Sequence, residues 1–324
     1  MDMKRIAVLT SGGDAPGMNA CIRAVVRTAI SEGLTIFGVH SGFEGILEGE
    51  FVPLSRRSVS NLIQKGGTFL KTSRCESFFH TSGRKRAADM LREWDIHGLV
   101  VIGGDGSFHG AHALSEEQGI RVVGVPGTID NDIYGTDLTI GYDTAVNTAI
   151  DLIDKIRDTA ASHDRIFIVE VMGRHAGFIA LEVGICGGAE EILVPEKQVT
   201  LEDLGQSVQV WNKAGKTSSL IILAEGSSLG NANQVAQEIK SKYNVACHVC
   251  ILGHTQRGGS PTSTDRILAS RLGYHAVKAL QAGQTDVMVG WQNNAVSHIP
   301  LPETWEKKKP LDSELLSIYR ILAK

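Results

Sequence analysis

The chain has 324 residues, of which 42% are hydrophobic and 21% charged, a composition typical of a globular protein with two domains or one large one. The formal net charge of −4 argues against a nucleic-acid-binding surface. No apolar run approaches the roughly 18 residues that a membrane helix needs, and the four apolar residues after Arg5 are too few for a signal peptide. We therefore expect no nucleic-acid partner and no membrane association.

The five cysteines are an odd number spread along the chain, which is typical of a reducing cytoplasm and not of a disulfide framework. Cys247 and Cys250 form one C-x-x-C pair, but a zinc site would need a second pair, and the sequence has none. Cysteines buried in a strand are the simpler interpretation. These features predict a cytoplasmic protein.

The chain opens with a predicted strand, a glycine-rich turn and a helix. Residues 6–9 are an apolar run of strand type, residues 10–17 form the turn, and residues 18–30 carry apolar side chains at helical spacing. This order presents backbone N–H groups and a helix N-terminus to phosphate, although it is neither G-x-G-x-x-G nor a Walker A motif. A tight turn without a ligand explains it equally well. Arg23 and Arg27 lie one helical turn apart, so they share a face, by default a solvated one.

A second glycine-rich turn follows the next predicted strand. Residues 66–74 lack any period and predict a loop, residues 82–94 predict a helix, and residues 99–102 predict a buried strand. The strand runs directly into Gly103-Gly104-Asp105-Gly106-Ser107. Three glycines around one aspartate leave mainly backbone amides and a carboxylate, which suits the phosphates of a nucleotide together with a magnesium ion.

The strand predicted from residue 122 ends in a turn that carries two carboxylates within three residues. The turn is Pro126-Gly127-Thr128-Ile129-Asp130-Asn131-Asp132. In open α/β sheets ligands bind at the carboxyl ends of the strands. Two acids this close repel each other, so both stay ionised only when solvated, hydrogen-bonded or metal-bound. Alternatively, the Asp and Asn side chains form local backbone hydrogen bonds in an ordinary turn.

The second half of the chain repeats the same pattern. Strands are predicted at residues 165–171, 219–223 and 248–252, each followed by a short loop with glycine and polar residues, and helices at residues 143–157 and 265–280. Alternating strands and helices predict an α/β fold with parallel sheet and right-handed crossovers. The loops at the strand ends can then converge on one site. The tail from residue 301 is richer in charge and proline and is predicted to wrap the surface.

Together the loops contain the parts that phosphoryl transfer requires, which are positioning, charge neutralisation and a base near the accepting hydroxyl. Asp105 suits the metal ion, and Asp130 suits the base, with Thr128 and Asp132 as neighbours. Guanidinium groups that could bind anionic oxygens are present on Arg74, Arg165, Arg174 and Arg257. Each of these arginines taken singly is more simply a surface ion pair. Serine-hydrolase and zinc-hydrolase motifs are missing.

Five motifs in the chain resemble those of the bacterial ATP-dependent 6-phosphofructokinases, in the same order from about residue 4 to about residue 300. The motifs are residues 10–19, 104–107, 126–132, 172–174 and 253–261. The resemblance implies two Rossmann-like parallel-sheet domains with the active site in the cleft between them. It implies a nucleotide-binding domain of residues 1–138 and 255–305, a sugar-phosphate-binding domain of residues 139–254, and a C-terminal tail of residues 306–324.

The resemblance also implies a reaction, in which the γ-phosphoryl group of Mg-ATP passes to the 1-hydroxyl of fructose 6-phosphate. The products are fructose 1,6-bisphosphate and ADP, and the reaction is the committed step of glycolysis. The residues that match the family's catalytic positions are Asp130 as the base, Thr128, Asp132 and Arg174. The residues that match its ATP positions are Gly13, Arg74, Cys75, Gly104, Asp105, Gly106 and Ser107, with Asp105 on magnesium.

The family's other sites are matched in the same way. The substrate positions correspond to Thr128, Ile129, Asp130, Arg165, Met172, Gly173, Arg174, Glu225, His248, His254, Thr255, Gln256 and Arg257, of which Arg165 matches a contact to a neighbouring subunit's substrate. The positions of an ADP or phosphoenolpyruvate effector site correspond to Arg23, Arg27, Arg157, Glu190 and Lys216. The resemblance implies a homotetramer with this effector site between subunits.

The chain departs from the family pattern at three positions. His248 stands where an arginine commonly contacts the substrate phosphate across a subunit interface, Ala214 replaces a basic effector residue, and Phe79 replaces an ATP-side arginine. Pyrophosphate-using relatives have aspartate at the position of Gly106, where a side chain would crowd the α-phosphate, and lysine at that of Gly127. Glycine at both positions leaves room for a nucleotide, so we expect ATP as the donor.

Three other classes of protein fit the sequence less well. Lipid and NAD kinases share the Gly-Gly-Asp-Gly loop but lack the Thr-Ile-Asp-Asn-Asp segment. An inactive effector-binding subunit would be expected to have lost Asp130 or Asp105, and both are present. A dehydrogenase would need a dinucleotide-binding fingerprint, which the sequence lacks.

Overall fold

The computed structural model describes residues 3–161, 165–214, 216 and 218–323, with the backbone alone at positions 161 and 165. The chain divides into two compact units. Unit 1 consists of Met1–Ile129, Ile133–Thr144 and Arg257–Lys309, and unit 2 of Asp130–Asp132, Ala145–Gln256 and Pro310–Lys324. The last segment belongs to unit 2, whereas the sequence predicted a separate tail from residue 306.

Unit 1 is built on a seven-stranded sheet with the strand order β11-β10-β5-β4-β1-β2-β3. Its strands are β1 (Arg5–Thr10), β2 (Thr35–Val39), β3 (Phe51–Pro53), β4 (Gly98–Gly103), β5 (Val122–Pro126), β10 (Val287–Gln292) and β11 (Ala295–Pro300). The five strands from β10 to β2 run parallel, and their interior residues are apolar on both faces, as expected for a sheet covered by helices on both sides.

The two edge strands of this sheet are antiparallel, which the sequence analysis did not predict. β3 pairs with β2, and β11 pairs with β10. Asn293 and Asn294 join β10 to β11, and both have positive φ, 51° and 60°. Two consecutive residues of positive φ make a turn whose twist matches that of a hairpin, and asparagine is one of the few residues that tolerates this conformation.

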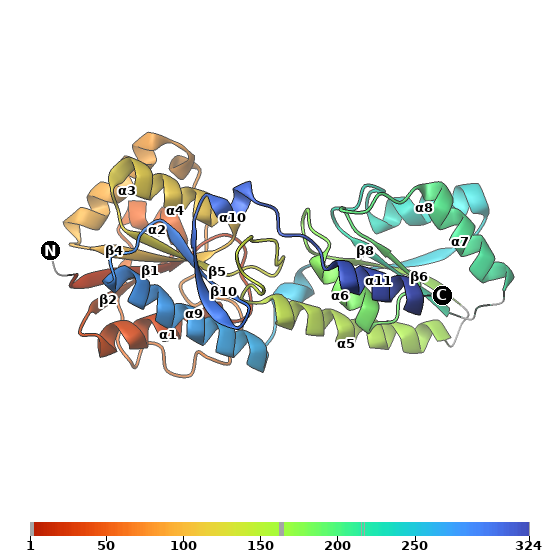
Figure 1. The fold of residues 1–324 in the computed structure, drawn as a ribbon, viewed down its shortest axis with the longest axis horizontal. Coiled ribbons are helices and arrows are strands. Elements are labelled where there is room, and N and C mark those ends of the chain that lie inside the picture. Colours follow the sequence, from red (N-terminus) through yellow and green to blue (C-terminus); the bar gives the residue numbers. More distant parts are fainter. Residues whose placement is uncertain (1–2, 162–164, 215, 217, 324) are drawn as a thin grey trace. The chain divides into compact units, whose positions relative to one another are not determined.

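Helices cover both faces of the sheet in unit 1 (Figure 1). On one face lie α1 (Met18–Ser31) and α9 (Ser263–Gln281), and on the other α2 (Gly42–Glu48), α3 (Thr81–Glu93) and α4 (Asp105–Gln118). α1 and α9 pack closely because Gly273 has no side chain, and a Cβ there would lie 2.8 Å from the Cys21 carbonyl oxygen. The short elements η1 (Glu76–Phe79) and α10 (Glu303–Glu306) complete this unit.

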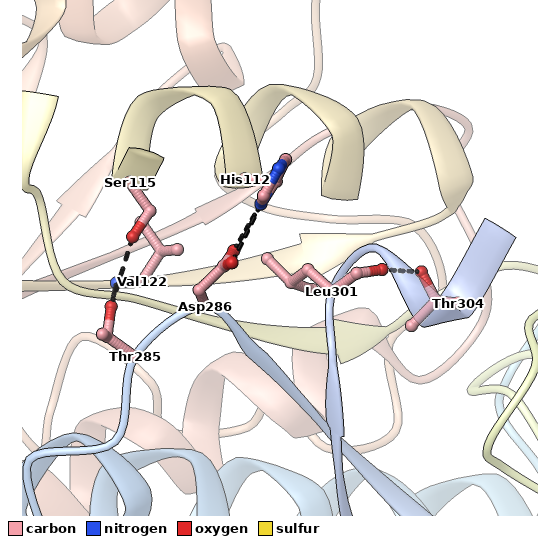
Figure 2. A network of polar contacts seen from close by, with 7 residues as sticks. All are labelled: His112, Ser115, Val122, Thr285, Asp286, Leu301 and Thr304. Atoms are coloured by element: carbon pink, nitrogen blue, oxygen red, sulfur yellow. Dashed lines mark hydrogen bonds and ion pairs between the residues drawn. The ribbon is translucent and has the colours of Figure 1, made fainter. Parts of the chain in front are cut away.

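Polar contacts join the segment that leads into β10 to α4 and β5 (Figure 2). His112 Nδ1 on α4 lies 2.9 Å and 3.0 Å from the two carboxylate oxygens of Asp286, just before β10, and the Thr285 hydroxyl accepts a hydrogen bond from the Val122 N–H at 3.0 Å. Burial raises the pKa of Asp286, and the His112 contact opposes this shift. The Trp305 ring stacks on His109 of α4 with 3.8 Å between centroids. These contacts hold the segment after β11 over the helix that starts at Asp105.

Unit 2 is built on a four-stranded parallel sheet with the order β7-β8-β6-β9. Its strands are β6 (Arg165–Val171), β7 (Glu191–Leu193), β8 (Ser218–Ala224) and β9 (Cys247–Ile251). Its helices are α5 (Tyr142–Ala161), which starts in unit 1, α6 (Phe178–Cys186), α7 (Leu201–Lys213), α8 (Ala232–Tyr243), α11 (Ser313–Leu322) and the 3₁₀ turn η2 (Gly253–Arg257). α7 and α8 lie on one face of the sheet, and α5, α6 and α11 on the other (Figure 1).

The ends of the helices in unit 2 are fixed by side chains. Thr200 and Asp203 form a capping box on α7, and Asn231 and Gln234 form one on α8, so first-turn N–H groups are satisfied. The Tyr319 hydroxyl of α11 accepts a hydrogen bond from the Ile192 N–H at 3.0 Å and lies 3.2 Å from the Glu190 carbonyl oxygen. Burial raises the pKa of this phenol. Tyr319 therefore anchors the C-terminal helix to β7.

The α/β fold with two parallel-sheet units confirms the fold class predicted from the sequence. Each strand and helix predicted from hydrophobic period is present, with ends that differ by at most four residues. Cys247 and Cys250 lie on β9 but are only half-buried, and the burial of Cys247 raises its pKa to about 11. Within the described ranges, no helix has the length and apolar character needed to cross a membrane.

Candidate active site

Two glycine loops of unit 1 meet at the ends of the neighbouring strands β1 and β4. The Ser11 N–H donates to the Ile102 carbonyl at 3.0 Å, which ties the first loop to the second. At Gly103 a Cβ would lie 2.5 Å from Ser107 Oγ and 2.7 Å from the Ser11 carbonyl oxygen, so only glycine fits there. Gly12 has φ 82°, a conformation that also favours glycine. The predicted ATP positions in these two loops thus form one surface made mostly of backbone.

Asp105 lies in this surface as the first residue of α4, after Gly104. Its Oδ1 atom is buried and makes no hydrogen bond with the described residues, and His109 Nε2 lies 3.5 Å away. The Asp105 side chain as a whole is 44% exposed, and a carboxylate at a helix N-terminus fits a magnesium ion that also binds phosphate oxygens. In the described part of the chain no three His, Cys, Asp or Glu residues gather around one point.

The segment before α3 carries the other predicted nucleotide contacts. Arg74 is exposed, whereas Cys75 is 8% exposed, and burial raises the pKa of its thiol to about 11. Cys75 is therefore a neutral thiol at physiological pH and no nucleophile. Phe78 stacks on Phe43 with 4.2 Å between centroids, but the next residue, Phe79, is 82% exposed. The departure from the family pattern at Phe79 thus exposes an apolar ring at the surface.

Arg257 and Thr128 lie against the glycine loops within unit 1. The Arg257 guanidinium occupies the space beside Gly13, where a Cβ would come within 2.4 Å of Nη1, and it donates to the Asp14 carbonyl at 3.1 Å. A Cβ on Gly104 would lie 3.5 Å from Thr128 Cβ. The structure therefore brings together two predicted substrate residues and two predicted ATP residues. The guanidinium of Arg257 thus places one positive charge next to Gly13 in the first glycine loop.

Residues 130–132 of the turn after β5 belong to unit 2, together with the loop that follows β6. Asp130 is 2% exposed, and Arg174 Nε lies 3.8 Å from its Oδ2 atom. Arg174 has φ 53°, and its N–H donates to Glu225 Oε1 at 2.6 Å, so the loops after β6 and β8 are joined. The Arg174 side chain is 60% exposed. The arrangement places a buried carboxylate and an accessible guanidinium side by side.

The remaining predicted substrate residues differ in exposure. The Gln256 side chain is fully buried and accepts a hydrogen bond from the Met172 N–H at 2.9 Å, so it orients the loop that contains Gly173. Ile129 is also fully buried, which leaves only its backbone for a ligand. Exposed side chains occur on Glu225, His248, His254 and Thr255. Arg165 begins β6, and its side chain lies outside the described residues.

The predicted effector residues fall into two groups. In unit 2, Arg157 donates to the carbonyls of Gly187, at 2.5 Å, and Gly188, while Glu190 pairs with Lys216 at 3.0 Å. These three side chains therefore gather on the segment of residues 187–190. In unit 1, Arg23 and Arg27 share a face of α1, and burial, together with the charge of Arg27, lowers the pKa of Arg23.

The sequence and the fold were then compared with those of known proteins. The Phosphofructokinase family model matches residues 5–280. The chain belongs to the phosphofructokinase family. It is 54% identical over 321 residues to ATP-dependent 6-phosphofructokinase 1 of Thermus thermophilus, covering 99% of this chain and 100% of that protein.

Solved phosphofructokinases have the same fold. The structure of the Saccharomyces cerevisiae enzyme matches with a TM-score of 0.86 and 36% identity over 98% of this chain, which spans 46% of the yeast chain. A pyrophosphate-dependent phosphofructokinase from Marinobacter aquaeolei matches with a TM-score of 0.83 and 25% identity, covering 96% of this chain and 86% of that one. A pyrophosphate-dependent phosphofructokinase therefore shares this fold, so the fold alone does not determine the phosphoryl donor.

Two polar residues near these loops were not singled out from the sequence. His109 follows Asp105 by one helical turn, and that i,i+4 spacing is a signal that could have identified it. Asp265 lies in the first turn of α9 and is 1% exposed. An aspartate at a helix start ordinarily indicates a cap, and nothing in the sequence shows that its partners lie on another helix.

Proposed function

We propose that this protein is an ATP-dependent 6-phosphofructokinase, which transfers the γ-phosphoryl group of ATP to the 1-hydroxyl of fructose 6-phosphate. The products are fructose 1,6-bisphosphate and ADP, as in glycolysis. The observation that carries the proposal is the buried Asp130 carboxylate beside the Arg174 guanidinium, 3.8 Å apart, in a chain 54% identical to an ATP-dependent 6-phosphofructokinase. Unit 1 binds the nucleotide, and unit 2 binds the sugar phosphate.

In the proposed reaction Asp130 accepts the proton of the 1-hydroxyl as that oxygen forms its bond to the γ-phosphorus. The bond from the γ-phosphorus to the β,γ-bridging oxygen breaks, and ADP leaves. The negative charge on the transferred group is balanced by cationic side chains, for which the accessible Arg174 guanidinium beside Asp130 is the candidate. Arg257, next to Gly13, supplies a second positive charge in unit 1.

Magnesium, when bound, neutralises charge on the phosphates of ATP. Asp105 would hold it, because its Oδ1 atom is buried and makes no hydrogen bond with the described residues. Backbone N–H groups of the two glycine loops and the first turn of α4 bind the phosphate oxygens.

The donor follows from the surroundings of two glycines. A Cβ on Gly106 would meet no atom within 4 Å, so a side chain there would project into the open space beside Asp105. A Cβ on Gly127 would lie 2.9 Å from Ile102 Cγ2 and 3.2 Å from Met18 Cε, so a larger residue there requires these core side chains to shift. The space beside Gly106 can therefore accommodate a nucleotide, whereas a lysine at position 127 would require Ile102 and Met18 to move. Both features support ATP over pyrophosphate.

Regulation and assembly are part of the same proposal. Lys216, Glu190 and Arg157 gather around the segment of residues 187–190, and a cluster of two cations and one acid suits an anionic effector such as ADP or phosphoenolpyruvate. The protein functions in the cytoplasm as a homotetramer, in which this site and that of His248 lie near neighbouring subunits.

The test is a coupled assay of purified protein with fructose 6-phosphate and either ATP or pyrophosphate, following fructose 1,6-bisphosphate. We expect turnover with Mg-ATP and at most a trace with pyrophosphate. A faster rate with saturating pyrophosphate than with saturating ATP would overturn the assignment of ATP as the donor. If neither donor gave fructose 1,6-bisphosphate, the proposed function would be overturned.

A further inference from the structure

Asp265 is a buried carboxylate that the reaction described above does not use. It is 1% exposed, and the described residues offer it no ion pair. Its Oδ1 atom accepts from the Gly141 N–H at 2.7 Å, and its Oδ2 atom accepts from the Thr144 N–H at 2.8 Å and from the Thr144 hydroxyl at 2.5 Å. All three donors belong to the start of α5, whereas Asp265 itself belongs to α9. The carboxylate therefore caps the N-terminus of a different helix.

The two helix starts are locked together around this carboxylate. Thr262, the N-cap of α9, donates its hydroxyl to Asp143 Oδ2 at 2.5 Å and its N–H to Thr144 Oγ1 at 3.1 Å. The Thr262 hydroxyl also accepts from the Asp265 N–H at 3.3 Å. Since the N-terminus of a helix carries partial positive charge, two such ends stabilise one buried carboxylate.

The start of α5 is in turn joined to the loop that leads to Asp130. Ile140, next to Gly141, donates its N–H to the Pro126 carbonyl at 2.9 Å and forms a bridge with Gly127. The Thr139 hydroxyl donates to the Thr128 carbonyl at 2.6 Å. The backbone bound by Asp265 is therefore one or two residues from the backbone that holds residues 126–128.

The start of α9 is joined to the loop that carries Arg257. Arg266, the residue after Asp265, donates to the Pro261 carbonyl at 2.7 Å and to the Ser260 hydroxyl at 3.0 Å. Residues 257–262 thus enter α9 in a fixed path. Asp265 is the point at which the two loops of unit 1 that carry substrate residues are joined.

We propose that Asp265 is a positioning residue for phosphoryl transfer, whose ionised carboxylate aligns the Gly127–Thr128 segment with the Arg257 loop by joining the starts of α5 and α9. The proposal rests on the proposed function and concerns a residue that contacts neither substrate. Its physical basis is that a misplacement of about 1 Å far from the chemistry can cost roughly 100-fold in rate.

Because the proposed role requires the ionised carboxylate of Asp265, its contribution to kcat should depend on pH. Burial raises its pKa to about 6, the three hydrogen bonds from α5 oppose this, and the acid of Asp143 contributes to the increase. Because the folded pKa lies above the ordinary value of 3.8, the ionised form costs folding free energy, and stability from this group falls as pH rises from about 4 to about 6. A charge kept at such a cost is expected to serve function.

The decisive experiment compares the parent with Asp265→Asn, which keeps the shape but has only one accepting atom and no charge. At pH 8 we expect kcat about 10- to 100-fold below the parent, with KM for ATP within about twofold, because the glycine loops are untouched. As pH falls towards 5 the parent also loses the charge, so the ratio of the two kcat values should narrow. Any other group that titrates in this range is common to both proteins and cancels in that ratio.

A purely structural cap would behave differently. Asp265→Asn would then melt at a changed temperature but, per folded molecule, keep the parental kcat, or lose activity by a factor that stays constant with pH; either outcome overturns the proposal. Thr144→Val replaces the hydroxyl that donates to Asp265 by a methyl group and should show a smaller decrease in kcat. This variant tests the proposal if Asp265→Asn does not fold. A parent without phosphofructokinase activity would instead overturn the proposed function, and the parent is assayed first.

Discussion

The proposed nucleotide surface of unit 1 consists mainly of backbone, whereas the proposed acceptor surface of unit 2 consists mainly of side chains. In unit 1 the loops 11–13 and 103–107 are mostly backbone, and at Gly103 a side chain would collide with Ser107. In unit 2 the candidate groups are side chains at strand ends, such as Arg174 and Glu225, and many are exposed. A surface of backbone tolerates almost no substitution, whereas a surface of side chains can change one group and retain the rest.

The departures of this chain from its family follow that difference. His248, Phe79 and Ala214 all replace side chains that the family uses for charge, and none lies in the two glycine loops. His248 and Phe79 are exposed in the structure, so their replacement costs the fold little. We therefore expect this protein to differ from other family members in ligand affinity and in regulation. We expect the two glycine loops to have the same role as in the rest of the family.

The largest effect is expected for Asp130→Asn, which removes the proposed base and retains its shape. A positioned base contributes about 10²–10⁴-fold, so kcat should fall by that factor while ATP binding is unchanged. Steady-state kinetics with a parallel measurement of ATP affinity checks this. Asp137→Asn is the matched control, since Asp137 is an exposed acid further along the same connection, and its Oδ2 atom accepts from the Asn293 N–H. An Asp130→Asn variant with half the parental kcat would exclude the role.

A matched pair of glycine substitutions tests the backbone-built surface. Gly103→Ala would place a methyl group 2.5 Å from Ser107 Oγ, so unfolding free energy should fall by about 1–3 kcal/mol and ATP binding should weaken. Gly106→Ala meets no atom within 4 Å, so stability should stay within about 0.5 kcal/mol while KM for ATP rises. Urea unfolding and ATP kinetics of both variants decide the matter. Equal loss of stability in the two would show that the loops are not packed as described.

How far the sequence could predict this molecule depends on how local each feature is. The turns after β1 and β4 were found because glycines directly after an apolar run are a local signal, and the central helices were found from their period. The hairpin at Asn293–Asn294 was missed because asparagines replace the usual glycine in its turn. Asp265 was missed because its partner Thr144 is 121 residues away, and only the fold brings them together.

Lys216→Ala tests the proposed effector cluster. Removing the partner of Glu190 should weaken the response to ADP or phosphoenolpyruvate by up to about 1–3 kcal/mol of coupling, with kcat unchanged when no effector is added. The apparent affinity for fructose 6-phosphate, titrated with and without each effector, is the measurement. Lys213→Ala, at the exposed end of α7, is the control. An effector response identical in Lys216→Ala and the parent would place the effector site elsewhere.

The smallest effect is expected at His248, an exposed residue of β9 whose ring lies 5.4 Å from that of Phe167 between centroids. Histidine is the side chain whose charge ordinarily changes between pH 5 and 8, whereas arginine stays charged. If His248 contacts the substrate phosphate, His248→Arg should tighten fructose 6-phosphate binding at pH 8. The gain should be at most about fivefold, because an exposed ion pair contributes roughly 0.2–1 kcal/mol.

Comparison of the two proteins across pH separates His248 from the substrate, whose phosphate also titrates. Both proteins meet the same substrate, so its ionisation near pH 6 cancels in the ratio of their apparent constants. The advantage of arginine should be larger at pH 8 than at pH 6, because arginine keeps its charge over that whole range. Parallel profiles would show that the phosphate does not contact position 248. In that case the arginine–phosphate contact of the family would be missing at position 248, with no substitute from His248. Loss of one such contact is compatible with the fold, because the residue is an exposed side chain.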